Sequence, residues 1–193
     1  MNMNASRLGA WLSKPFIFFT LIMVLKILLA QFVIFDEASA WLQIATGIPS
    51  VWVLFCLVEW LAPKRKLGFY LTVDLIVTSI YFAVIMYYKY FGVIVTYHAL
   101  QQVNQVTEVK GSVFSLLHPY FLFIYTDVVV LLLLYMNKRF RAWKKTLAGR
   151  ESNALVSAVF GVSLVVSVST IWYHSDGINE LKQAENMGIL NYE

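Results

Sequence analysis

The chain has 193 residues, of which 60% are hydrophobic and only 13% are charged. Soluble domains are about half apolar and about a quarter charged, so this composition excludes an ordinary soluble enzyme and favours a protein of the lipid bilayer. The single cysteine, Cys56, excludes an internal disulfide and a multi-cysteine zinc site.

Five apolar windows are long enough to cross a membrane, which requires about 20 residues. The first is too long and too loosely bounded for a cleaved signal peptide, so we interpret it as a retained span. Pro49 disturbs the start of the second window. The sequence therefore predicts an all-α integral membrane protein, with a five-span domain over 1–172 and an extracellular linker over 173–193. The predicted spans are 15–35, 41–61, 69–88, 119–136 and 154–172.

The basic residues set the orientation of these spans. When the N-terminus is placed in the cytoplasm, most of the 15 lysines and arginines fall on that side, above all in the segments 64–66 and 138–150. The positive-inside rule then predicts the N-terminus inside and the C-terminus outside. A nucleic-acid patch in 138–150 is the alternative, but orientation already accounts for the net charge of +4, so we expect no nucleic-acid partner.

Four ionisable residues lie inside the apolar windows, where charge is costly. Lys26 and Asp127 lie at matched depth, about 12–14 Å below the outer surface, which suggests an ion pair that locks spans one and four. Two alternatives remain open: Lys26 contacts a lipid phosphate, or the pair belongs to a proton relay. Glu59 and Asp74 lie near the cytoplasmic ends of spans two and three, where we expect them to reach the interface or to pair with the cations of 64–66.

Small residues follow one face of the fifth window. Ala154, Ser157, Ala158 and Gly161 share this face and are followed by Ser163 and Ser167, and small residues permit close contact between membrane helices. We expect the face to pack inside the molecule; a dimer interface is the alternative.

The longest hydrophilic stretch, 89–118, lies between the third and fourth windows on the outer side. Its apolar residues recur at helical spacing, which predicts an extracellular amphipathic helix along the membrane surface. No catalytic motif and no metal-ligating cluster occurs in the chain. The candidate surface residues of this loop are Lys89, His98, Gln101, Gln102 and Gln105.

Several segments distributed over essentially the whole chain form a pattern known from one protein family. They are Tyr87-Tyr88-Lys89-Tyr90-Phe91, Leu100-Gln101-Gln102-Val103, His118-Pro119-Tyr120, Asp127, Leu25-Lys26 and the tail from Asn186 to Tyr192. Together they resemble the membrane domain of the bacterial lipoteichoic acid synthase family. Val93 stands where members of the family often carry an aspartate.

The resemblance implies a role in Gram-positive cell wall biogenesis. Family enzymes, which include synthases and primases, transfer glycerol phosphate from phosphatidylglycerol onto a growing polymer and release diacylglycerol. Their chemistry belongs to an extracellular domain with a threonine nucleophile and Mn²⁺. This chain carries no catalytic residue of that domain, so we expect no cofactor within it. We expect it to anchor that domain in the bacterial cell membrane and to present the lipid substrate.

The expected partners are membrane lipids, the catalytic domain and a second copy of the chain or another protein of the cell envelope. Two other functional classes remain open. One is a small transporter or channel that uses Lys26, Asp74 and Asp127 as its pathway, and the other is a membrane sensor or adaptor.

Overall fold

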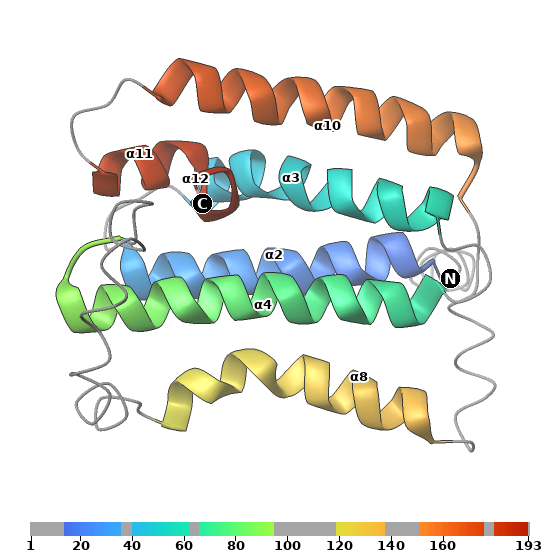
Figure 1. Ribbon diagram of the computed structural model, residues 1–193, viewed down its shortest axis with the longest axis horizontal. Coiled ribbons are helices and arrows are strands. Elements are labelled where there is room, and N and C mark those ends of the chain that lie inside the picture. The colour runs from blue at the N-terminus through green and yellow to red at the C-terminus, as the bar shows by residue number, and fades with distance from the viewer. Residues whose placement is uncertain are drawn as a thin grey trace, which may run out of the picture.

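The chain folds into a bundle of long helices, seen in a computed structural model that describes residues 14–35, 40–61, 66–94, 119–137, 151–175 and 180–192. These ranges contain helices and no strands, which confirms the all-α prediction for the described part of the chain. The elements are α2 (Pro15–Ile34), α3 (Ala40–Leu61), α4 (Lys66–Phe91), the 3₁₀ helix η2 (Pro119–Tyr125), α8 (Thr126–Met136), α10 (Asn153–His174), α11 (Glu180–Met187) and α12 (Ile189–Tyr192) (Figure 1).

Four helices among the described residues are long and apolar enough to cross a membrane: α2, α3, α4 and α10. They match the first, second, third and fifth predicted windows. The fourth window is divided, because its first seven residues form η2 and only the following 11 form α8. Tight 3₁₀ turns are frequent at the start of α-helices, and here Pro119 begins the segment.

The long helices alternate in direction. In Figure 1, α10 lies along one side of the bundle, α3 lies beside it, α2 and α4 follow, and α8 lies on the far side. The short helices α11 and α12 return along α3, so the C-terminal end of the described chain lies against the bundle.

The core forms where α2, α3 and α4 meet. Phe19 stacks on Tyr70 with ring centroids 5.2 Å apart, and Phe55 approaches the same ring at 5.0 Å. All three side chains are fully buried. In a bilayer, such packing contributes through close contact rather than through the removal of apolar surface from water.

Of the small residues predicted to pack inside the molecule from the fifth span, only Ser163 and Ser167 do so. Ala154, Ser157, Ala158 and Gly161 are all exposed. The bundle instead contacts another face of α10, whose buried residues are Val156, Ser163 and Ser167. Polar contacts from α3 select this face: the Cys56 thiol donates to the Val156 carbonyl oxygen at 3.5 Å, and the hydroxyls of Ser50 and Ser167 lie 3.1 Å apart.

Candidate functional site

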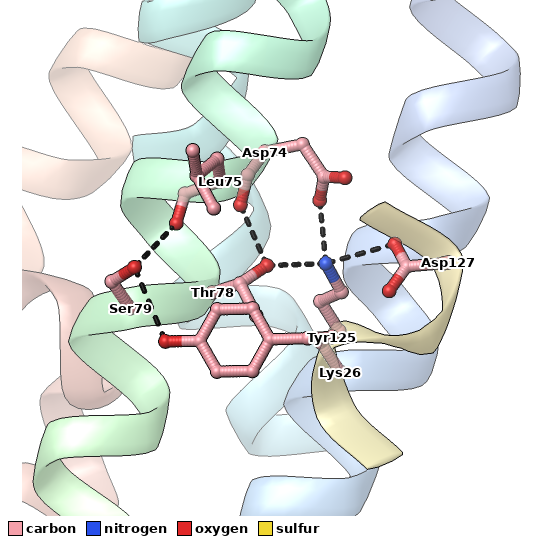
Figure 2. Close-up of polar contacts among 7 residues, drawn as sticks. All are labelled: Lys26, Asp74, Leu75, Thr78, Ser79, Tyr125 and Asp127. Carbon is pink, nitrogen blue, oxygen red and sulfur yellow. Dashed lines mark hydrogen bonds and ion pairs between the residues drawn. The ribbon is translucent and has the colours of Figure 1, made fainter. Parts of the chain in front are cut away.

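A cluster of polar side chains joins three elements in the middle of the bundle. The Lys26 ammonium on α2 donates to Asp74 Oδ1 on α4 at 2.6 Å and also to the Thr78 hydroxyl. Thr78 in turn donates to the backbone carbonyl of Asp74 at 2.6 Å. Figure 2 shows these groups converging on the lysine nitrogen.

Asp127 completes this intramembrane cluster from α8. Its Oδ2 lies 2.9 Å from Lys26 Nζ, so the structure brings together the two residues that the sequence placed at matched depth. Asp127 occupies the first turn of α8, where the positive end of the helix dipole favours a carboxylate. Its side chain remains 27% exposed, whereas the side chain of Asp74 is fully buried.

The position of Asp74 differs from the sequence interpretation. Asp74 pairs with Lys26 rather than with the cations of 64–66. The reason is geometric: α4 begins at Lys66, three residues before the predicted window, so Asp74 lies about 12 Å along the helix axis from its start. Thr78, which sequence reasoning missed, stands one helical turn after Asp74 on the same face.

A second polar group lies at the end of α3. Glu59 accepts hydrogen bonds from the Lys66 ammonium and, at 3.0 Å, from the Tyr70 hydroxyl. All three side chains are buried. Glu59 therefore pairs with one of the cations expected for it, and the contact joins the end of α3 to the start of α4.

The C-terminal segment 180–192 binds to the other half of α3 through polar contacts. The Gln43 amide donates to the Glu185 carbonyl. Asn191 Nδ2 donates to the carbonyl oxygen of Thr46 at 2.9 Å, and the Ser50 hydroxyl donates to Asn191 Oδ1. We call this set of contacts the C-terminal clasp.

Pro49 lies inside α3, between the clasp residues Thr46 and Ser50. A proline inside a helix has no N–H to donate, and its ring disturbs the preceding turn. Asn191 supplies a donor to the carbonyl of Thr46 in this turn. The sequence signal was the spacing of Gln43, Thr46 and Ser50, which places all three on one face of the helix.

Gly188 allows the clasp to close. Its φ of +79° lies in the left-handed region, and a Cβ built on it would stand 2.9 Å from Thr46 Oγ1 and 3.2 Å from the backbone nitrogen of Gly47. Ala184, Met187 and Ile189, on either side of the turn, are buried. The segment thus packs closely on α3 and is not a free tether at this end.

An apolar groove of about 620 Å³ runs between α4 and the η2–α8 segment. It extends from Gly68 and Tyr135 to Leu75 and Tyr125, on the half of the bundle where α4 begins. Its lining is almost entirely apolar, so its chemistry suits hydrocarbon chains and not head groups.

Comparison with known proteins decides the family. The profile of the lipoteichoic acid synthase N-terminal domain matches residues 1–192. The chain belongs to the lipoteichoic acid synthase N-terminal domain family. This confirms the resemblance read from the sequence. No curated protein and no solved structure matches the chain.

The remaining candidate residues of this lipoteichoic acid synthase domain lie at or beyond the end of α4. Lys89 is exposed in the last turn of that helix. His98, Gln101, Gln102 and Gln105, together with the predicted amphipathic loop helix, fall outside the described residues.

The described part of the lipoteichoic acid synthase domain does not fit the Mn²⁺ of the family. Nowhere in it do three His, Cys, Asp or Glu side chains come together as ligands. In the intramembrane cluster, the Lys26 ammonium already occupies the position between the two carboxylates. We therefore derive no chemical step through a metal here.

Proposed function

We propose that this membrane domain anchors a phosphoglycerol transferase domain at the outer face of the bacterial membrane and presents its lipid substrate, phosphatidylglycerol. Family membership supports the lipoteichoic acid pathway. Because the scissile phosphate of a membrane lipid stays at the interface, an anchored enzyme meets it at high effective concentration.

We propose that the chain crosses the membrane five times. Beside the four long helices, η2 and α8 add seven residues at about 2.0 Å and 11 residues at about 1.5 Å rise, which amounts to roughly 30 Å. That length matches the hydrocarbon thickness of a bilayer. The alternating directions of the helices and the basic segments 64–66 and 138–150 favour a cytoplasmic N-terminus and an extracellular C-terminus.

The observation that carries the anchoring role is the C-terminal clasp. Asn191 contacts both Thr46 and Ser50 on α3, so the end of the chain is fixed to the bundle. A transferase joined after residue 193 would emerge from a fixed point beside the membrane surface. In this proposal the clasp restricts the height and orientation of the active site relative to the lipid phosphates, and diacylglycerol returns to the same leaflet.

The proposal is tested in cells depleted of their own lipoteichoic acid synthase. The membrane domain is joined after residue 193 to the transferase domain of a family member, and polyglycerolphosphate is measured by immunoblot. We expect polymer from the joined protein and little when the same transferase domain is secreted alone. Equal synthesis without the membrane domain would overturn the anchoring role.

Reporter fusions test the topology separately. Alkaline phosphatase fused after residue 193 should be active because it folds outside the cell, whereas the same enzyme inserted in 138–150 should be inactive. The reverse pattern would overturn the proposed orientation.

A further inference from the structure

The intramembrane cluster contains more negative than positive formal charge. Lys26 contributes one cation, while Asp74 and Asp127 contribute two carboxyl groups. The other polar groups of the described elements around it bring no compensating charge: Thr78 of α4 is neutral, the Tyr125 hydroxyl of η2 bonds to Ser79, and Glu59 of α3 is engaged with Lys66 and Tyr70. With both carboxyls ionised, the cluster would hold one uncompensated negative charge near the centre of the bundle.

Two carboxyl oxygens of the cluster, Asp74 Oδ2 and Asp127 Oδ2, also lack a hydrogen bond of good geometry among the described residues, although Asp127 Oδ2 lies 2.9 Å from Lys26 Nζ. Asp74 is 0% exposed, and although its Oδ1 accepts from Lys26, its Oδ2 has no donor among the described residues. A buried carboxylate oxygen without a donor is costly, and a buried group with excess charge tends to become neutral. One bound cation that can donate a hydrogen bond would compensate both the excess negative charge and the missing donor.

A proton fits this site better than a metal ion. The Lys26 ammonium lies 2.6 Å from Asp74 Oδ1 and 2.9 Å from Asp127 Oδ2, so it repels a second cation from the space between the carboxyls. A proton needs no ligand shell, because it forms an O–H bond to one carboxyl oxygen. That O–H is then a donor, and the two carboxyls lie close together, because Asp74 Oδ1 and Asp127 Oδ2 both contact Lys26 Nζ.

We propose that the cluster binds one proton, shared between the carboxyl groups of Asp74 and Asp127. The proton comes from water, which transfers it to a carboxylate oxygen; no other bond forms or breaks. Asp127 is the more accessible of the two carboxyls, because its side chain is 27% exposed whereas that of Asp74 is fully buried. With the proton bound, the cluster is neutral and α8 is held against α2 and α4. Without it, the two carboxylates repel each other across the contact between α4 and α8.

Infrared spectroscopy of the full chain in lipid nanodiscs tests this site directly. At neutral pH we expect a C=O band of a protonated carboxylic acid, which shifts in heavy water because the proton exchanges. The band should disappear in Asp127→Asn and in Asp74→Asn. It should persist in the control Glu151→Gln, because Glu151 pairs with Lys14 away from the cluster.

Each outcome decides the proposal. Absence of the band from the wild type, or its persistence in both aspartate variants, would overturn it. Loss of the wild-type band on adding sodium would also overturn it, because a metal cation would then neutralise the carboxyls. If Asp74→Asn fails to fold, Asp127→Asn carries the comparison, since its side chain is partly exposed and circular dichroism reports whether the bundle is intact.

Discussion

Replacing Gly188 with alanine should detach the C-terminal segment from α3. Glycine is required here for two reasons: its φ is +79°, and an added Cβ would stand 2.9 Å from Thr46 Oγ1. A left-handed conformation costs alanine about 1–2 kcal/mol. Thr46 cannot move away freely, since its hydroxyl donates to the Leu42 carbonyl at 2.9 Å, and breaking that bond costs on the order of 1 kcal/mol.

The two costs together amount to about 2–3 kcal/mol, which weakens docking roughly 30- to 150-fold. Hydrogen exchange of the amides in 180–192, measured in nanodiscs, reports the docking equilibrium. We expect protection of this segment to fall by that factor, while exchange in α2 and α4 stays unchanged.

Two other glycines are matched controls. Gly92 has a φ of +71° with nothing within 4 Å of an added Cβ, so Gly92→Ala introduces the conformational strain at a distance from the clasp. Gly161 also has free space, and it lies inside α10, where alanine stabilises a helix by about 0.5–1 kcal/mol relative to glycine. Neither control should change exchange in 180–192. Wild-type protection in Gly188→Ala would refute the reasoning.

Three further predictions concern the polar contacts. Glu59→Leu leaves the buried Lys66 without its partner and should lower the free energy of unfolding, measured by thermal unfolding, by about 3–5 kcal/mol. The double variant with Lys66→Met should regain most of this loss. A double variant as unstable as the single one contradicts the prediction. Asn191→Leu removes the donor to Thr46 and the acceptor for Ser50, so the docking free energy of 180–192, measured by hydrogen exchange, should fall by about 1–3 kcal/mol. Unchanged exchange would disprove the role of this side chain. Glu151→Gln breaks the ion pair with Lys14, whose side chain is 40% exposed and stays solvated, so the free energy of unfolding should fall by less than about 1 kcal/mol; a loss as large as that of Glu59→Leu would show that the pair is not screened.

The sequence predicted how deep each polar residue lies in the membrane better than it predicted which residues that side chain contacts. Counting residues from the window ends placed Lys26 and Asp127 at one level, and the structure brings them within 2.9 Å. The same counting misplaced Asp74, because hydropathy excluded Lys66 from the third window although this lysine is buried against Glu59. An ion pair inside the protein removes the cost that hydropathy assigns to a lone charge, and composition alone does not reveal the pair.

The face of a helix that meets its neighbours was also hard to predict. Six small residues on α10 were predicted to pack inside the molecule, but the face that contacts Cys56 and Ser50 of α3 includes only Ser163 and Ser167 of these six. Likewise, the segment after the fifth span, 173–193, was predicted to be an extracellular linker. Its docking depends on a partner face on α3 whose polar residues stand some 140 positions earlier in the chain. Such pairings are properties of two segments together, so neither segment shows them alone.

Polar contacts determine how these helices are arranged, because lipid provides little hydrophobic drive for one apolar helix to choose another. Three sets of contacts lie at three levels of the bundle and join different partners. Glu59 and Lys66 link the end of α3 to α4, Lys26 links α2 to α4 and α8, and Asn191 links the C-terminal segment to α3. Removing one set should therefore leave every span inserted and loosen only the elements that this set joins. That separation is what makes the clasp and the intramembrane cluster testable independently: a variant of Gly188 should leave the carboxylic acid band unchanged, and Asp127→Asn should leave exchange in 180–192 unchanged.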